Sequence, residues 1–150
     1  MDSERIDDAI KLYEQALDGM FKNDYYTISR LAEAYFNKGE YERVCEYAER
    51  VTHVLEFKKS RTQFIYGAAL VKMGKSDLAE EQLKQIDSRY SNYPERIFYA
   101  DFLLKRGKKD AAKEVYNEIL SEAAHMKREN KRKNSESIFI AREELEKLKE

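Results

Sequence analysis

Three glycines recur at nearly equal intervals along this chain, and their spacing constrains the fold more than any other feature. They are Gly39 in YFNKGEY, Gly74 in LVKMGKS and Gly107 in LLKRGKK, and successive glycines lie 35 and 33 residues apart. Each glycine follows an amphipathic segment that has a basic residue near its end, and precedes a fresh amphipathic segment. A glycine in that position is typical of the left-handed C-cap that ends a helix before a tight turn. The pattern therefore predicts three pairs of helices built on one repeating unit.

Other positions keep the same register in every unit. Seven residues before the glycine and five residues after it, the side chain is small or is valine: Ala32, Gly67 and Ala100, then Val44, Ala79 and Ala112. Small residues at these two points allow the helices of a pair to approach closely. Apolar positions follow at helical spacing along each second helix: Ala48, Leu83 and Tyr116, then Val51, Ile86 and Ile119. We predict that these positions form the core.

The composition of the 150 residues supports helices and argues against several other classes of protein. One proline and five glycines are too few for the turns of a β-sandwich of this length. With 38% charged and 42% hydrophobic residues, the chain is too apolar to be disordered and too charged to span a membrane. Its net charge of −1 creates no global field that attracts nucleic acid or anionic lipid, so an electrostatic partner would need a local patch.

The sequence predicts an all-α fold with about eight helices in a single domain over residues 1–150. The expected helices cover residues 4–20, 25–38, 41–56, 59–73, 76–89, 93–106, 109–128 and 135–149. They group into a half repeat (4–20), three repeats (about 25–56, 59–89 and 93–128) and a C-terminal capping helix (135–149). Such a capping helix covers the last apolar face of a repeat array.

The glycine spacing and the recurring small residues resemble the tetratricopeptide repeat (TPR) family, whose period is 34 residues. The resemblance spans most of the chain and implies an α-solenoid, in which antiparallel helix pairs wind into a right-handed superhelix. Val44 departs from the family pattern because it replaces the usual alanine. Ile28, Gln63 and Arg96 depart from it because they stand where the first helix of a repeat carries an aromatic anchor.

The first segment, DDAIKLYEQALD, has the register of a second helix that lacks its first helix, because Ala9 lies 35 residues before Val44. One apolar side would then stay uncovered, and this suggests the soluble part of a longer protein. The combination of LYEQALDGMFKND, the repeats and a long final helix pair is similar to a group of bacterial TPR proteins whose amino terminus carries membrane segments. Residues 1–20 hold no apolar run suited to a signal peptide or a spanning helix. We therefore expect a cytoplasmic protein, or the soluble domain of a membrane-anchored one.

Side chains that perform catalysis or bind metals are few and scattered. His53 and His125 have no His or Cys four residues away, so no metal site and no other cofactor is expected. Cys45, the only cysteine, has no histidine placed to activate it and cannot form an intrachain disulfide. Motifs for phosphate binding and for a catalytic serine do not occur. The sequence therefore predicts that the protein is not an enzyme.

In the TPR family, the first helices of successive repeats line a concave groove that receives a peptide or a partner's helix. The resemblance places groove residues on the expected helices 25–38, 59–73 and 93–106. They are Tyr26, Ser29, Glu33, Phe36 and Asn37, then Arg61, Phe64, Ala68, Val71 and Lys72, then Ile97, Asp101, Leu104 and Lys105. Apolar side chains rimmed by charged ones suit a bound helix or extended segment of another protein. The alternative is that Phe36 and Leu104 pack against a neighbouring or terminal helix.

One kind of TPR ligand is not expected. Chaperone-binding members hold a C-terminal carboxylate with lysine, asparagine and arginine side chains on their first helices. The matching positions of the first repeat are Ser29 and Glu33, and the carboxylate of Glu33 would repel such a ligand.

The segment HMKRENKRKN, residues 125–134, contains a basic patch. Its basic residues are Lys127, Arg128, Lys131, Arg132 and Lys133, against the single acidic residue Glu129. The patch suits anionic lipid or RNA phosphates, but no aromatic residues for base stacking are interleaved, so nucleic acid is not expected. The alternative is a solvated helix end or loop.

Three hypotheses follow from the sequence. The leading one is a non-catalytic scaffold that binds another protein or peptide in the concave groove. The second is an adaptor that contacts an anionic membrane or nucleic acid through residues 127–133. The third is a self-associating array, in which the uncovered face of helix 4–20 pairs with another copy.

Overall fold

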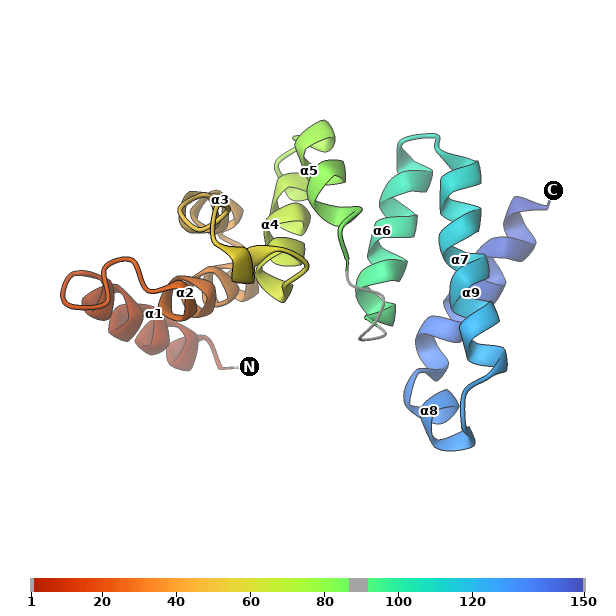
Figure 1. Cartoon of the computed structure of the whole chain (residues 1–150), viewed down its shortest axis with the longest axis horizontal. Coiled ribbons are helices and arrows are strands. Elements are labelled where there is room, and N and C mark those ends of the chain that lie inside the picture. Colours follow the sequence, from red (N-terminus) through yellow and green to blue (C-terminus); the bar gives the residue numbers. More distant parts are fainter. Residues whose placement is uncertain (1, 87–91, 150) are drawn as a thin grey trace. The chain divides into compact units, whose positions relative to one another are not determined.

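The computed structural model of the chain describes residues 2–86 and 92–149, which form two compact units, Met1–Asp87 and Ser88–Glu150 (Figure 1). The first unit contains α1 (Ser3–Leu17), α2 (Tyr25–Lys38), α3 (Tyr41–Glu49), the 3-10 helix η1 (Leu55–Phe57), α4 (Arg61–Lys72) and α5 (Ser76–Leu83). The second unit contains α6 (Tyr93–Lys105), α7 (Lys109–Ala124), α8 (Arg128–Lys133) and α9 (Ser135–Leu148). The described residues contain no strand, which confirms the predicted all-α class.

The three spaced glycines end helices α2, α4 and α6 as predicted. Gly39, Gly74 and Gly107 adopt left-handed backbone angles, with φ of 81°, 76° and 77°. In each turn the N–H after the glycine donates to the carbonyl five residues earlier, over 3.0, 2.9 and 2.9 Å. This 6→1 hydrogen bond defines a Schellman motif, which satisfies a carbonyl at the end of the helix. The same turn therefore recurs three times and reverses the chain each time.

The first unit is built from helices packed against their neighbours in sequence. In addition, α2 packs against α4, so alternate helices also touch. The predicted small positions lie in these contacts, because Ala32, Val44 and Ala79 are fully buried. Gly67 of α4 lies so close to α5 that an added Cβ atom would sit 2.9 Å from a methyl carbon of Leu83. The small residues thus allow the close approach that their spacing predicted.

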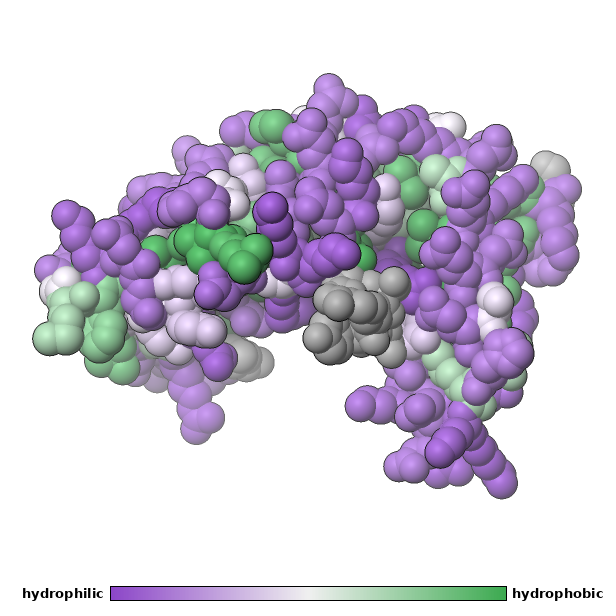
Figure 2. Space-filling view, viewed as in Figure 1, coloured by the Kyte–Doolittle hydropathy of each residue, from purple (hydrophilic) through white to green (hydrophobic). Residues whose placement is uncertain are grey.

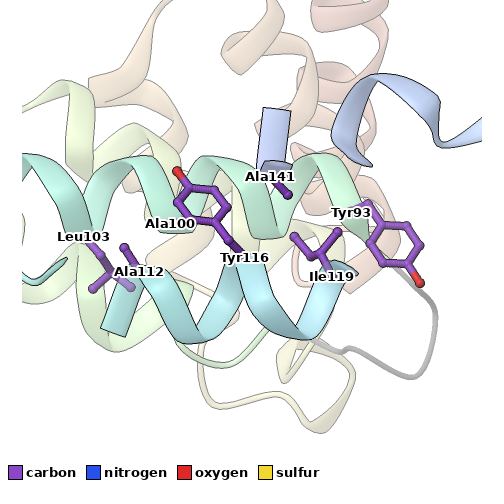
Figure 3. Close-up of a cluster of buried hydrophobic side chains, with 7 residues drawn as sticks. All are labelled: Tyr93, Ala100, Leu103, Ala112, Tyr116, Ile119 and Ala141. Atoms are coloured by element: carbon purple, nitrogen blue, oxygen red, sulfur yellow. The ribbon is translucent and has the colours of Figure 1, made fainter. Parts of the chain in front are cut away.

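The second unit forms its core between α6, α7 and α9. Figure 3 shows this cluster, which consists of Tyr93, Ala100, Leu103, Ala112, Tyr116, Ile119 and Ala141. The terminal helix α9 contributes Ala141 and packs against both α7 and α6. It covers apolar side chains of α6 and α7, as predicted for residues 135–149.

The expected helix 41–56 is wrong in its second half, because α3 ends at Glu49. Here the N–H groups of Arg50 and Val51 bond to carbonyls three residues back, which tightens the last turn. The following run Val-Thr-His-Val is rich in β-branched residues, which are weak helix formers. The chain then enters η1 and buries Phe57 against Tyr66, with the ring centroids 6.3 Å apart.

The expected helix 109–128 also ends early, at Ala124, and the segment that follows forms α8. At this end the N–H of Met126 bonds to the carbonyl of Ala123, three residues back, and Met126 packs against the core cluster. No residue of α8 is buried. The expected helix 76–89 is wrong in its last part as well, because α5 ends at Leu83 and residues 84–86 are not helical; the predicted end at residues 87–89 lies outside the described part.

Candidate functional site

The predicted groove residues of the first unit lie on α2 and α4, and one ion pair joins the two helices. The Arg61 guanidinium lies 2.9 Å from a carboxylate oxygen of Glu33, and both side chains reach solvent. Near the start of α2, Tyr26 is 70% exposed, and its ring meets that of Tyr25 edge-on. Exposed charge and an exposed aromatic ring therefore occur on the same pair of helices.

The other apolar groove candidates of this unit are half-buried. Phe36 packs edge-on against Tyr41, with ring centroids 5.7 Å apart, so part of its surface is used inside the unit. Phe64 and Val71 of α4 are also half-buried. The alternative that Phe36 packs against a neighbouring helix is therefore correct in part, although the ring keeps some solvent contact.

Four further candidates of the first unit fall into two groups. Asn37 and Lys72 are exposed near the ends of their helices. The Ser29 hydroxyl is buried and has no hydrogen-bond partner among the described residues. Ala68 is fully buried, so it belongs to the core and its side chain offers no surface to a ligand.

The groove candidates of the second unit lie on α6. Ile97 and Leu104 pack against the core cluster and are half-buried. Asp101 and Lys105 are exposed and form an ion pair of 2.9 Å along one face of the helix. Ile97 and Asp101 also line a cleft of about 320 Å³, whose opposite wall is formed by α9.

The predicted basic patch forms α8 and the residue before it. All five basic residues are exposed, and within the described chain none of them forms an ion pair. Lys131 also lines a cleft of about 360 Å³ between α7 and α9. The patch is therefore a solvated helix whose charge is free to attract an anion.

Three exposed apolar side chains of the first unit were not expected from the sequence. Met20 and Phe21 lie in the loop between α1 and α2, and Leu55 lies in η1; all three are exposed. Figure 2 shows apolar surface over this loop and over η1. A hydrogen bond of 3.0 Å from Arg50 to the Lys22 carbonyl ties the loop to the end of α3. The Met-Phe pair in an otherwise polar connection was the only signal in the sequence.

The side chains considered for catalysis are poorly placed for it. The Cys45 thiol is buried, with its Sγ 3.6 Å from the sulfur of Met73, and burial raises its pKa. His53 and His125 are exposed. Within residues 2–86 and 92–149, no three His, Cys, Asp or Glu side chains gather in a way that could hold a metal ion.

None of the helices in the described ranges combines the length and the apolar character needed to cross a bilayer.

The comparisons with known proteins assign no family. No protein-family model matches the chain, and no curated protein matches it significantly in sequence. The helices and their surface residues therefore carry the functional inference by themselves.

Proposed function

We propose that this protein is a non-catalytic scaffold of the TPR kind, which binds a helix or an extended segment of another protein on the α2/α4 face. Three Schellman turns of the same kind support the proposal, together with the small residues Ala32, Gly67, Ala79, Ala100 and Ala112 at equivalent points of three helix pairs. The contact between α2 and α4 supports it further, because it places two first helices of successive repeats side by side. A surface shared by two helices offers a partner a longer contact than either helix alone.

The observation that carries the proposal is the chemistry of this face. The Glu33–Arg61 ion pair links the helices, and exposed Tyr26 on α2 with half-buried Phe64 on α4 supplies apolar area on the same two helices. Interfaces are enriched in tyrosine and arginine, because these side chains bury large areas while keeping a polar group. The mixture suits an amphipathic helix or an extended peptide rather than a small molecule.

Affinity capture from lysate of the source organism tests the proposal. The native chain is compared with a variant that removes an aromatic ring and a charge from the α2/α4 face, Tyr26→Ser with Arg61→Ser. A matched control, Leu78→Ser with Arg43→Ser, removes an apolar side chain and an arginine from α5 and α3. Arg43 is a fair match for Arg61, because it too forms an exposed ion pair, over 3.4 Å with Glu46.

We expect one protein to be retained by the native chain and by the control variant, and to be lost by the α2/α4 variant. Circular dichroism must show equal helix content in all three chains. Equal retention by both variants would place the contact elsewhere. Capture of nothing by the native chain would contradict the scaffold role.

A further inference from the structure

An open cleft of about 430 Å³ runs between α1 and α2 in the first unit. Ile6 and Ala9 of α1 and Ala34 of α2 supply its apolar lining. Arg5 and Arg30 stand at its rim, and both are exposed. Neither arginine forms an ion pair within the described chain. The cleft is therefore an apolar trough with two exposed arginines at its rim, and its one carboxylate, Glu33, is paired with Arg61.

The repeat register identifies what kind of element fits this trough. The Gly39-to-Gly74 spacing of 35 residues relates α1 and α2 to α3 and α4. Adding 35 to the number of a cleft residue gives its counterpart in the next repeat. Five lining residues have counterparts that are at most 1% exposed: Ala9, Tyr13, Arg30, Glu33 and Ala34 correspond to Val44, Ala48, Ile65, Ala68 and Ala69. In the next repeat these counterparts are covered in part by helix α2, which packs against both α3 and α4. By this correspondence, the α1/α2 cleft is a binding site for a helix that packs as α2 packs on α3 and α4.

The last helix of the second unit has a free side. Helix α9 packs against α7 and α6, as α4 packs against α3 and α2. Helix α4 also packs against α5, whereas within the described part of the second unit only the short α8 packs on α9 besides α7 and α6. Phe139 is 60% exposed on α9, and Glu136, Glu143 and Glu146 are exposed at positions that share its face. This outward face carries one aromatic ring among three carboxylates and one exposed arginine, Arg142, so its charge is acidic on balance.

We propose that copies of this chain assemble head to tail, with the outward face of α9 from one copy seated in the α1/α2 cleft of the next. The charges are complementary, because acidic residues flank Phe139 and arginines flank the trough. In this placement α9 runs antiparallel to α1, as successive helices of the array do, so Glu146 approaches the end of the cleft that holds Arg5. Phe139 packs against Ala9 and Leu12, of which Leu12 is 66% exposed in the single chain.

The same contact fills a second open site. Helix α1 of the next copy then lies against the cleft between α7 and α9, which is lined by Leu120, Ala123 and Phe139 and rimmed by Lys131 and Arg142. Acidic residues Glu4 and Asp8 are exposed on α1 and match these two cations. The two surfaces of the contact differ, so the interface is heterologous, and each copy leaves one free surface at each end.

Analytical ultracentrifugation of the full chain over a wide concentration range tests this assembly. We expect the native chain to grow from its 17.8 kDa monomer to larger species, and salt to weaken the association. The head-blocked variant, Leu12→Glu with Arg30→Glu, and the tail-blocked variant, Phe139→Glu, should each stay monomeric. All three substituted residues are exposed, so folding should be unaffected. The control Leu78→Glu, on α5 outside both surfaces, should assemble like the native chain.

Mixing the two blocked variants gives the decisive result. Each retains the surface that the other has lost, so the mixture should form a heterodimer of twice the chain mass and nothing larger. A native chain that stays monomeric at every concentration would overturn the proposal. A mixture without heterodimer, or a blocked variant that still associates alone, would overturn it equally.

Discussion

At the scale of single residues, one repeating position is buried in every repeat although its side chain is apolar in one repeat and polar or charged in the others. Ile28, Gln63 and Arg96 occupy equivalent places on the first helices, and all three are buried. Isoleucine needs only apolar neighbours, but the other two need polar partners. The Gln63 amide donates to Gln82 over 3.0 Å and accepts from the Lys59 N–H over 2.7 Å. The repeat therefore determines that the residue is buried, while the hydrogen-bond partners of a polar side chain at this position differ from one repeat to the next.

Arg96 meets this requirement with a carboxylate on the neighbouring helix. Arg96 is 4% exposed, and its guanidinium donates two hydrogen bonds to Glu122, over 2.8 and 3.1 Å. The Tyr93 hydroxyl donates to the same carboxylate over 2.8 Å. Burial alone would raise the pKa of Glu122, but these hydrogen bonds and the charge of Arg96 outweigh it and hold the pKa below the usual 4.5. The network therefore favours the ionised form of Glu122.

Replacing Glu122 with alanine should destabilise the protein, because it leaves the Arg96 charge buried without its main partner. We expect a loss of about 2 kcal/mol, below the roughly 3–5 kcal/mol of a fully buried pair, because the Glu122 side chain is 39% exposed. Glu118→Ala is the control: this glutamate also faces Arg96, at 3.5 Å, but it is 66% exposed. It should cost less than about 1 kcal/mol. Urea unfolding followed by circular dichroism measures both values.

The contribution of Glu122 should depend on pH in a defined direction. A carboxylate whose pKa is lowered by folding stabilises the protein above the unfolded pKa, and this stability is lost as pH falls through the folded value. The gap in unfolding free energy between native chain and Glu122→Ala should thus shrink when the pH is taken from 7 to below 4. A gap that stays constant over that range would show that the ion pair is not its source.

At the scale of helices, close approach depends on residues that lack a side chain or have a short one. Gly67→Ala tests this directly at the α4/α5 contact. Helix propensity alone would favour alanine by about 1 kcal/mol. However, the new methyl group would meet fully buried Leu83 at 2.9 Å, and overpacking of this kind costs about 1–3 kcal/mol. We therefore expect a net loss of about 1 kcal/mol in unfolding experiments.

Two comparisons make the Gly67 result interpretable. At Gly19 an added Cβ would have only the Ala16 carbonyl within 4 Å, at 3.9 Å, so Gly19→Ala should be close to neutral. Shortening the opposing side chain with Leu83→Val should reduce the cost of Gly67→Ala, since the two positions are coupled. A Gly67→Ala variant that is more stable than the native chain would show that the helices separate freely.

Most helix starts and the C-cap glycines were predictable from the sequence, but the ends of α1, α3, α5 and α7 were not, because all four helices end earlier than expected. The starts of α2, α3, α5, α6, α7 and α9 agree with the expected ranges, because glycine turns and local patterns fix them. The early ends of α3 and α7 depend instead on Phe57 and Met126, whose packing partners are distant in sequence or on other helices. No local pattern contains that information.

Pairings between helices were equally hidden. Glu14 and Glu49 lie 35 residues apart, and each accepts a hydrogen bond from a tyrosine of the next helix, Tyr35 and Tyr66 respectively. The tyrosines are only 31 residues apart, so they come from different turns of their helices, and no fixed register predicts both contacts. Burial, together with the neighbouring carboxylate, raises the pKa of each hydroxyl above its ordinary value.

The groove set was predicted by resemblance, and the structure sorts its members by exposure. Tyr26, Arg61 and Asp101 reach solvent, whereas Ala68 lies wholly in the core. A periodic pattern shows which face of a helix a residue occupies, but not whether a neighbouring helix covers it. The α1/α2 cleft shows the opposite case: its residues occupy positions that are buried in the next repeat, but here they line an open cleft.

At the scale of the whole molecule, the proposals assign different tasks to different surfaces. The α2/α4 face would receive a partner protein, while the α1/α2 cleft and the outward face of α9 would join copies of the chain. Tyr26 and Arg61 do not line that cleft, whereas Glu33, the ion-pair partner of Arg61, does, so the two surfaces meet at Glu33 on α2. An assembled array would present several partner-binding faces, and effective concentration would then strengthen the binding of a partner with repeated segments.

The central claim is that the first-helix face, and not the second helices, receives the partner. Its most direct test is photo-crosslinking in cells of the source organism, with a benzophenone amino acid placed at position 26 or 61, or at control positions 43 or 78. All four positions are exposed, so the probe itself should be tolerated. We predict that positions 26 and 61 crosslink to the same protein, identified by mass spectrometry, and that positions 43 and 78 do not. Adducts from positions 43 and 78 alone, or from all four positions equally, would contradict the claim.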